Sequence, residues 1–181
     1  AMSKLFGIKL CSILFNEFNQ DIVCLMPTNL YGIQDNFDIK SSHVIPGLVS
    51  KFLNAKKNRT NIKLWGTGRA IREFMYVDDL AEAILKTLQI SKSKLSQVFK
   101  KNLPLINVGT GEYISIINLA KMIKKIISFK GKILLDKKYP DGTMIKNLDS
   151  SNIKKLNWKP KIKLSEGLQK VIKSREKKIK K

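Results

Sequence analysis

Short apolar segments alternate with segments of helical periodicity along this chain, and that alternation limits the fold more than any other feature of the sequence. The short apolar runs, which predict strands, lie at residues 22–26, 62–65, 72–77, 105–108, 133–135 and 144–148. Apolar residues spaced three or four apart, which predict helices, recur at residues 5–15, 44–52, 80–88, 116–126, 151–156 and 164–172. Strands that alternate with helices predict an α/β fold built on a parallel sheet.

The charge of the chain is strongly basic, because 35 Lys and Arg residues outnumber 14 Asp and Glu residues and give a net charge of +21. The hydrophobic content of 43% is ordinary for a globular domain and excludes a disordered basic tail. Only four of the cations are arginines, the residue that proteins favour for clamping phosphates and reading bases. We therefore expect most of the lysine excess to be solvated surface, and any nucleic-acid binding to be salt-sensitive and without sequence preference.

Two cysteines and the lack of long apolar runs bear on the location of the chain. Cys11 lies in a helical apolar pattern and Cys24 in a strand-like run, so both are expected to be buried small hydrophobic residues in a reduced compartment. Two cysteines are too few for a disulfide framework or a metal cage. No run of about 18 apolar residues occurs, so a cytoplasmic protein without membrane contact is expected.

A glycine-rich phosphate-binding turn is the element that the 181 residues do not contain. A nucleotide-binding sheet opens with a strand, a G-x-G-x-x-G turn and a helix. Here Gly66-Thr-Gly68 and Gly109-Thr-Gly111 are each a lone G-x-G. The chain also enters helical spacing at its start, so we expect it to begin inside an element and to lack the first half of such a sheet.

Several short strings, taken together, resemble one enzyme family. They are Pro27-Thr-Asn-Leu-Tyr-Gly32, Ser42-His-Val-Ile-Pro46, Trp65-Gly-Thr-Gly68 followed by Arg72-Glu-Phe74, Val77-Asp-Asp79, Asn107-Val-Gly-Thr-Gly111 and Pro140-Asp-Gly-Thr143. Their order and spacing are similar to those of the GDP-L-fucose synthase family, a branch of the extended short-chain dehydrogenase/reductases, over residues 1–168. That family epimerises C3 and C5 of GDP-4-keto-6-deoxy-D-mannose and then reduces the C4 ketone with NADPH.

The resemblance implies a fold, a domain division and partners. It implies the C-terminal part of an extended Rossmann-like α/β fold, in which residues 1–40 end the NADP-binding domain. Residues 41–181 would form mainly the nucleotide-sugar domain, with segments near 72–108 returning to the cofactor domain. It further implies a homodimer in the intact family member, and a separate N-terminal half is an alternative partner.

Two residues are catalytic candidates by this resemblance. Lys4 matches the lysine of the family's Tyr-x-x-x-Lys motif, in which the lysine holds the nicotinamide ribose and favours the tyrosinate; taken alone, Lys4 reads as a solvated surface lysine. His43, the only histidine, matches an active-site histidine that contacts the cofactor region and acts as an acid in epimerisation. Imidazole changes charge near neutral pH, which suits proton transfer to carbon. A helix cap or a packed side chain is the alternative for His43.

The loop formed by Pro27, Thr28, Asn29 and Leu30 follows a strand at its carboxyl end, where open α/β sheets bind ligands. By resemblance this loop, together with Lys4 and His43, contacts NADP(H). Proline and asparagine are also common turn residues, so a plain turn is the alternative.

The remaining candidates concern the substrate. Arg72 is one of few arginines and lies beside a glycine-broken strand, which suits a bidentate grip on a diphosphate. The resemblance assigns Arg72 to the GDP pyrophosphate and adds Lys51 and Trp65 as substrate contacts, with Trp65 equally consistent with a core residue. Asp141 is a weaker candidate for the nucleoside end. Asp78 and Asp79 are expected to cap the helix that follows.

Four functions stay open at this level. The family activity is an NADP-dependent epimerase/reductase, although the 181 residues alone are expected to be inactive because they lack the glycine-rich turn and the catalytic tyrosine. The alternatives are a non-catalytic nucleotide-sugar-binding remnant, the C-terminal half of a split enzyme, or another NAD-dependent nucleotide-sugar epimerase or dehydratase.

Overall fold

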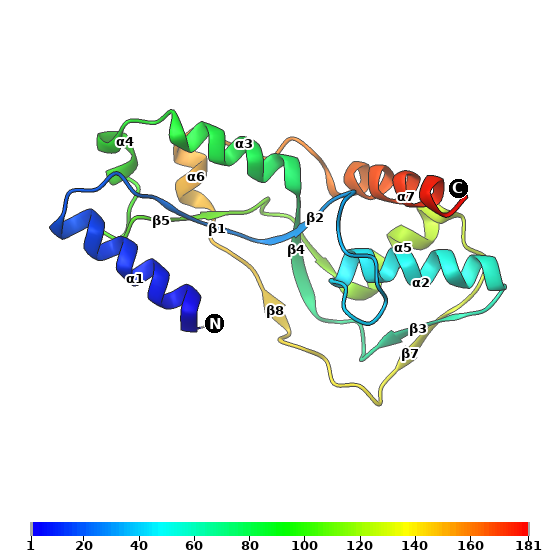
Figure 1. The fold of residues 1–181 in the computed structure, drawn as a ribbon. Helices are drawn as coiled ribbons and strands as arrows, with labels where there is room; N and C mark the ends of the chain where they lie inside the picture. Colours follow the sequence, from blue (N-terminus) through cyan, green and yellow to red (C-terminus); the bar gives the residue numbers. More distant parts are fainter. Residues whose placement is uncertain (1, 181) are drawn as a thin grey trace.

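A computed structural model describes residues 2–180 of the chain as a mixed α/β structure (Figure 1). The first elements are α1 (Met2–Glu17), β1 (Cys24–Pro27), β2 (Asn29–Tyr31), α2 (Val44–Asn58), β3 (Ile62–Trp65), β4 (Ile71–Tyr76) and α3 (Val77–Leu88). They are followed by α4 (Lys92–Ser96), β5 (Leu105–Val108), β6 (Tyr113–Ser115), α5 (Ile116–Ile127), β7 (Ile133–Asp136), β8 (Ile145–Lys146), α6 (Ser151–Lys155) and α7 (Leu164–Lys180). The α/β class predicted from the sequence is confirmed.

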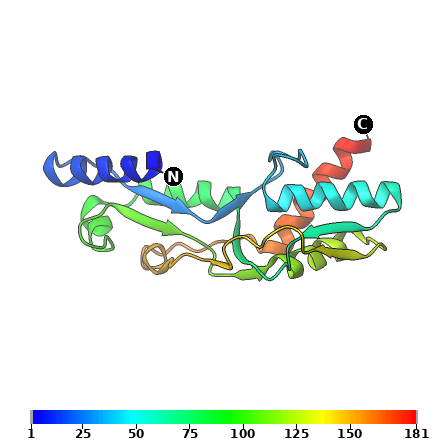
Figure 2. The ribbon, with the colours of Figure 1, turned by 90° about the horizontal axis from the view of Figure 1, so that it is seen from below.

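The strands form three small sheets that are mostly parallel. Strand β1 pairs with β5 and β3 pairs with β7, in both cases parallel. Strand β4 lies between β2, to which it is parallel, and β6, to which it is antiparallel, and it also pairs with β8. Because β4 lies between the other two sheets in space, it joins the two ends of the molecule (Figures 1 and 2).

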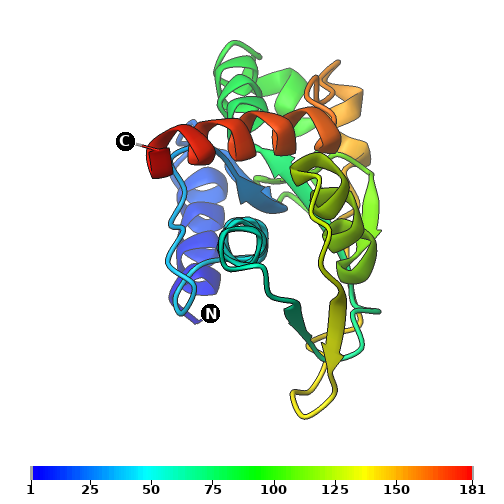
Figure 3. The same ribbon diagram turned by 90° about the vertical axis from the view of Figure 1, so that its right-hand side faces the viewer.

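Two hydrophobic clusters lie at the two ends. The larger cluster lies where α2, α5 and α7 pack together, and Figure 3 views α2 end-on, with α7 crossing above it. Phe52, Leu119, Ile123 and Leu168 in it have no exposed surface. The smaller cluster lies under α3 and α6 beside β5 and includes Met75, Ile106 and Ile153. Helical apolar spacing in α2, α5 and α7 therefore reflects one shared core.

The N-terminus of helix α3 differs from the sequence prediction. Its N-cap residue is Tyr76, which makes no side-chain cap bond, and Asp78 and Asp79 lie in its first turn. Asp79 is 2% exposed, and its carboxylate accepts the backbone N–H groups of Lys161 and Ile162 at 3.0 and 3.1 Å. The prediction that Asp78 and Asp79 cap the helix is wrong, because Tyr76 holds the cap position and a distant segment supplies the donors to Asp79.

The cysteines are less buried than predicted. Cys11 on α1 and Cys24 on β1 are both partly exposed free thiols. Their side chains contact each other, and burial together with the Cys11 thiol raises the pKa of Cys24 to about 11. A thiol with so high a pKa is a poor nucleophile near neutral pH, which agrees with a packing role. None of the helices within residues 2–180 combines the length and the hydropathy of a membrane-spanning segment.

Candidate functional site

A cavity of about 570 Å³ lies between the turn after β1 and the start of α2. Its lining includes three of the four predicted cofactor-loop residues, Thr28, Asn29 and Leu30, together with His43. Pro27 is the last residue of β1. Hydrogen bonds to β4 hold this loop in place, because Thr28 Oγ1 and Asn29 Nδ2 both donate to the backbone carbonyl of Glu73, at 3.0 and 2.8 Å. The structure thus brings the predicted loop and the predicted histidine to one cavity.

His43 is the N-cap residue of α2, yet its side chain makes no cap bond. It is exposed at the cavity wall, so the alternative of a packed histidine does not hold, and it occupies the cap position without a side-chain bond. Its imidazole is therefore free to meet a ligand in the cavity.

Lys4 lies apart from these residues. It is exposed on the first turns of α1, and it is not among the described residues that line the cavity. Geometry alone does not distinguish it from a surface lysine.

The predicted substrate residues lie close together at the other end of β4. The Nζ atom of Lys51 on α2 lies 4.6 Å from the ring centroid of Trp65, at the end of β3. Trp65 is 57% exposed, so the core alternative for this residue is wrong. Lys51 itself is partly covered, and this burial lowers the pKa of its ammonium group.

Asp141 lies between the turn that follows Trp65 and the segment that approaches Arg72. Its two carboxylate oxygens accept from the N–H and the Oγ1 of Thr67, at 2.9 and 2.6 Å, which holds the loop containing Asp141 against the Gly66-Thr-Gly68 turn. These bonds lower the pKa of the Asp141 carboxyl. On the other side of the loop, a Cβ added at Gly142 would lie 3.4 Å from Nη2 of Arg72. Asp141 therefore tethers its own loop to the Gly66-Thr-Gly68 turn, because both of its oxygens are occupied by Thr67.

Arg72 is partly buried on β4, and its Nη1 donates to the carbonyl of Ile71 at 2.7 Å. This bond holds one side of the guanidinium and leaves its other N–H groups for a ligand.

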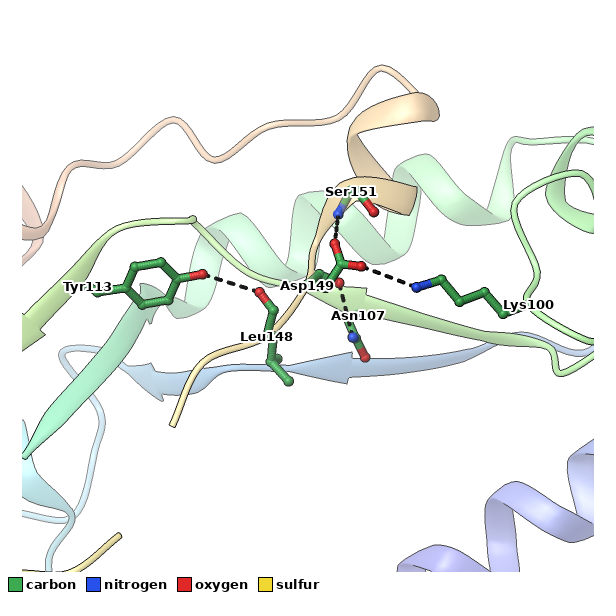
Figure 4. Close-up of polar contacts among 6 residues, drawn as sticks. All are labelled: Lys100, Asn107, Tyr113, Leu148, Asp149 and Ser151. Atoms are coloured by element: carbon green, nitrogen blue, oxygen red, sulfur yellow. Dashed lines mark hydrogen bonds and ion pairs between the residues drawn. The ribbon is translucent and has the colours of Figure 1, made fainter. Parts of the chain in front are cut away.

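Polar contacts hold the strand beside Arg72 (Figure 4). Residue Lys146 of β8 is the register partner of Arg72. Leu148 and Asp149 lie just beyond β8. The hydroxyl of Tyr113, in β6, donates to the carbonyl of Leu148, and Asp149 pairs with Lys100 at 3.2 Å. Asn107 Nδ2 donates to the Asp149 carbonyl at 3.0 Å. These bonds tie β8 to β5 and β6.

Glu73 is the residue that sequence reasoning missed. It has no exposed surface, and its Oε1 accepts from the Gly111 N–H at 2.8 Å and from Thr110 Oγ1 at 3.2 Å. Its backbone carbonyl receives the two loop bonds described above, so one residue connects the cavity loop, β4 and the Gly109-Thr-Gly111 turn. The available signal was a glutamate between Arg72 and Phe74 in an apolar strand, because a charged residue is almost never fully buried without partners.

Comparison with known proteins defines the class. A family model described as the NAD dependent epimerase/dehydratase family matches residues 1–100. The chain belongs to this family.

Within that family, the chain is similar to GDP-L-fucose synthases. Probable GDP-L-fucose synthase 1 of Oryza sativa subsp. japonica is 41% identical over 93% of this chain and 49% of its own length. GDP-L-fucose synthase of Escherichia coli (strain K12) is 39% identical over 93% of this chain and 53% of its own length. The resemblance predicted from the motifs is confirmed, and the chain spans about half the length of these curated relatives.

A solved structure agrees with these relatives. A GDP-mannoheptose C4 reductase from Campylobacter jejuni with NADP bound has a TM-score of 0.82 and 30% sequence identity. The likeness covers 97% of this chain and 59% of the reductase. The predicted extended short-chain dehydrogenase/reductase architecture is therefore confirmed.

Proposed function

We propose that this chain provides the nucleotide-sugar-binding part of an NADP-dependent epimerase/reductase that converts GDP-4-keto-6-deoxy-D-mannose to GDP-L-fucose. The observation that supports the proposal most is the grouping of Lys51, Trp65, Arg72 and Asp141 from separate segments at one end of β4. Two cations beside an exposed aromatic ring suit a nucleoside diphosphate, whose charge is in the diphosphate and whose base is flat.

In this proposal Arg72 grips the diphosphate. Its guanidinium offers several N–H groups in one plane, a geometry that matches phosphate oxygens. Lys51 adds a second positive charge from α2. Trp65 and Asp141 determine the position of the surrounding loops, and the sugar extends toward the cavity that contains His43.

The residues at the cavity fit the nicotinamide end of NADP(H). Thr28 and Asn29 attach the loop to the Glu73 carbonyl, and Leu30 and Phe74 add apolar lining for a flat ring. The bound cofactor supplies the hydride for reduction of the keto group. His43 is placed to give a proton to carbon during epimerisation, because its imidazole is exposed at the same cavity. Lys4 is proposed to contact the cofactor only by its match to the family motif.

The two clusters of the fold support a division between cofactor and substrate parts. We propose that the smaller cluster, with β1 and β5, belongs to the cofactor domain and that the larger one belongs to the nucleotide-sugar domain. The predicted division near residue 40, with the 72–108 segment returning to the cofactor domain, stays a proposal. The clusters follow it only in part, because Ile153, Leu156 and Trp158 also belong to the smaller one.

Helix α1 supports a proposed partner surface. Five large apolar side chains lie within one face of the helix at 45–76% exposure, namely Met2, Leu5, Phe6, Leu10 and Ile13. The opposite face packs inward, with Phe15 edge-on to Phe99. A helix that is apolar on two sides needs a second partner. We propose that a second copy covers this face in a homodimer; a separate N-terminal half and a cytoplasmic location also stay predictions.

Binding of GDP to the purified 181-residue chain, measured by calorimetry, tests the proposal. We expect GDP to bind, and Arg72→Gln to weaken binding about tenfold or more, because it removes charge-assisted bonds to the diphosphate. Arg59→Gln is the matched control, since Arg59 is an exposed residue at the end of α2 and its loss changes the net charge equally. Equal effects of the two substitutions, or no GDP binding by the unaltered chain, would overturn the proposal.

Turnover is a separate measurement. We expect the 181 residues alone to leave NADPH unoxidised in the presence of the keto-sugar, because they contain no glycine-rich turn and no tyrosine one helical turn before Lys4. NADPH oxidation by a mass-verified sample would contradict this expectation.

A further inference from the structure

Trp65 and Tyr139 form a stacked aromatic pair on the surface. Their ring centroids lie 4.5 Å apart and their planes differ by 17°. Trp65 is 57% exposed and Tyr139 is 45% exposed. Exposing two large rings that already stack on each other is unfavourable in water, because their outer surfaces are apolar. A third flat group that stacked on the pair would cover part of this exposed apolar surface.

The two faces of the Trp65 ring are both occupied. Tyr139 stacks parallel to the indole, and the Lys51 ammonium lies 4.6 Å from the indole centroid. A parallel ring and an ammonium group at these distances cannot share one face, so they lie on opposite faces. A ligand ring can therefore reach a face of Trp65 only by displacing one of these side chains.

Tyr139 keeps one face free. Its other face lies against Trp65, so its exposed surface belongs to the outward face and the hydroxyl edge. The residue lies in the segment between β7 and β8, and its backbone N–H donates to Asp136 O at 3.4 Å. Asp136 is the β7 residue in register with Trp65, so paired strands hold both rings.

Tyr139 lies in the same segment as residues that approach the proposed diphosphate residue Arg72. Asp141, two residues beyond Tyr139, is bonded to Thr67, two residues beyond Trp65. The following residue, Gly142, approaches the Arg72 guanidinium. A nucleoside diphosphate held by Arg72 thus has an aromatic ring within the same loop for its base.

We propose that the outward face of Tyr139 is the stacking surface for the purine base of the bound nucleoside diphosphate. Trp65 supports the Tyr139 ring from behind, and Lys51 holds Trp65 in place from the opposite side. The inference rests on the proposed function and deepens it, since it assigns the base to a residue other than Trp65. Base–aromatic stacking is tolerant of base identity, so this surface contributes affinity for the base and little choice between purines.

Nuclear magnetic resonance of bound GDP tests the stack directly. A base that lies over an aromatic face experiences its ring current, so we expect the guanine H8 signal to move upfield on binding to the unaltered chain. We expect the same shift with Tyr139→Phe, which keeps the ring, and its loss with Tyr139→Leu, which keeps apolar contact with Trp65. Persistence of the upfield shift in Tyr139→Leu would show that the base stacks elsewhere and would overturn the inference.

Affinities separate this inference from the proposed function. We expect Tyr139→Leu to raise the Kd for GDP about 5- to 100-fold, the range for loss of one base–aromatic stack. The Kd for inorganic pyrophosphate should be unchanged, because that probe has no base. One outcome would overturn the inference and leave the proposed function standing. In it, pyrophosphate binding is lost in Arg72→Gln, and the Kd for GDP is the same in Tyr139→Leu as in the unaltered chain. Failure of both probes to bind would overturn the proposed function and the inference with it.

A substitution elsewhere on the same surface serves as a control for general loss of structure. Met144→Ala removes another half-exposed apolar side chain from the same connection between β7 and β8. We expect it to leave GDP affinity unchanged, with the urea midpoints of all variants close to that of the unaltered chain. A loss of GDP affinity in Met144→Ala equal to that in Tyr139→Leu would overturn the inference.

Discussion

The carboxyl oxygen Oε1 of Glu73 accepts a hydrogen bond from the backbone N–H of Gly111 at 2.8 Å. This bond joins β4 to the turn that follows β5, across 38 residues of chain. Ser150 lies at the same point, because a Cβ added at Gly109 would be 2.5 Å from both Glu73 Oε1 and Ser150 Oγ. Gly109 therefore has to be glycine for the turn to approach Glu73.

Glu73→Ala should lower the free energy of unfolding by about 2–4 kcal/mol, because it removes buried contacts and leaves the Gly111 N–H and the Thr110 hydroxyl without their acceptor. Glu73→Gln keeps a carbonyl acceptor, so its effect should stay within about 1 kcal/mol. Urea unfolding of both variants provides the comparison. Equal stability of Glu73→Ala and the unaltered chain would show that the Gly111 turn holds without this bond.

Asp79 should matter to stability while its neighbour Asp78 should not. Asp79→Asn replaces one acceptor oxygen with a donor that faces the Lys161 and Ile162 N–H groups, so it should cost about 1–3 kcal/mol. Asp78→Asn changes an exposed residue on the same turn and should stay within about 0.5 kcal/mol. Urea midpoints at neutral pH measure both effects, and similar midpoints for the two variants would contradict the assignment.

Local signals predicted most of the elements but not β2, α4 and β6, and long-range contacts explain the misassigned partners. The predicted strands at residues 62–65 and 105–108 match β3 and β5 residue for residue. Both are short apolar runs bounded by glycine or proline, and such signals are local. The resemblance likewise assigned Lys51 and Trp65 to the substrate, and the Lys51 ammonium lies 4.6 Å from the Trp65 ring centroid.

The errors concern partners that sequence spacing does not show. Asp79 binds a segment 82 residues away, so a local capping rule misassigned it. Tyr139 has no helical or strand pattern around it, and its importance depends on a ring that is distant in sequence. Glu73 is identifiable only as an unexplained charge in an apolar strand, because its donors come from the turn after another strand.

Acid should weaken the fold through Asp149. Hydrogen bonds from Ser151, together with the Lys100 ammonium, lower the pKa of the Asp149 carboxyl from 3.8 to about 2. A carboxyl group with a lowered folded-state pKa stabilises the fold fully above its unfolded-state pKa, and that contribution disappears as the pH falls through the folded-state pKa. The stability contributed by Asp149 should therefore decline between about pH 4 and pH 2.

Urea unfolding across that pH range measures the effect. Asp149→Asn should flatten the acid decline, since the amide has no proton to take up. Lys100→Gln should flatten it only partly, because the Ser151 bonds remain. An acid decline in Asp149→Asn as steep as that of the unaltered chain would exclude this carboxyl as a contributor.

Two glycines should respond to alanine in opposite directions. Gly68 has a φ of +70°, and an added Cβ would lie 3.0 Å from the Cβ of Ile117 and 3.2 Å from Cδ2 of Leu64. Gly68→Ala should therefore cost about 1–3 kcal/mol through backbone strain and crowding. Gly7 lies within α1, and a Cβ there would meet no atom within 4 Å. Gly7→Ala should raise stability by about 0.5–1 kcal/mol, because alanine loses less conformational freedom in a helix. Urea unfolding followed by circular dichroism compares the two variants, and a stability gain in Gly68→Ala would contradict the left-handed turn before β4.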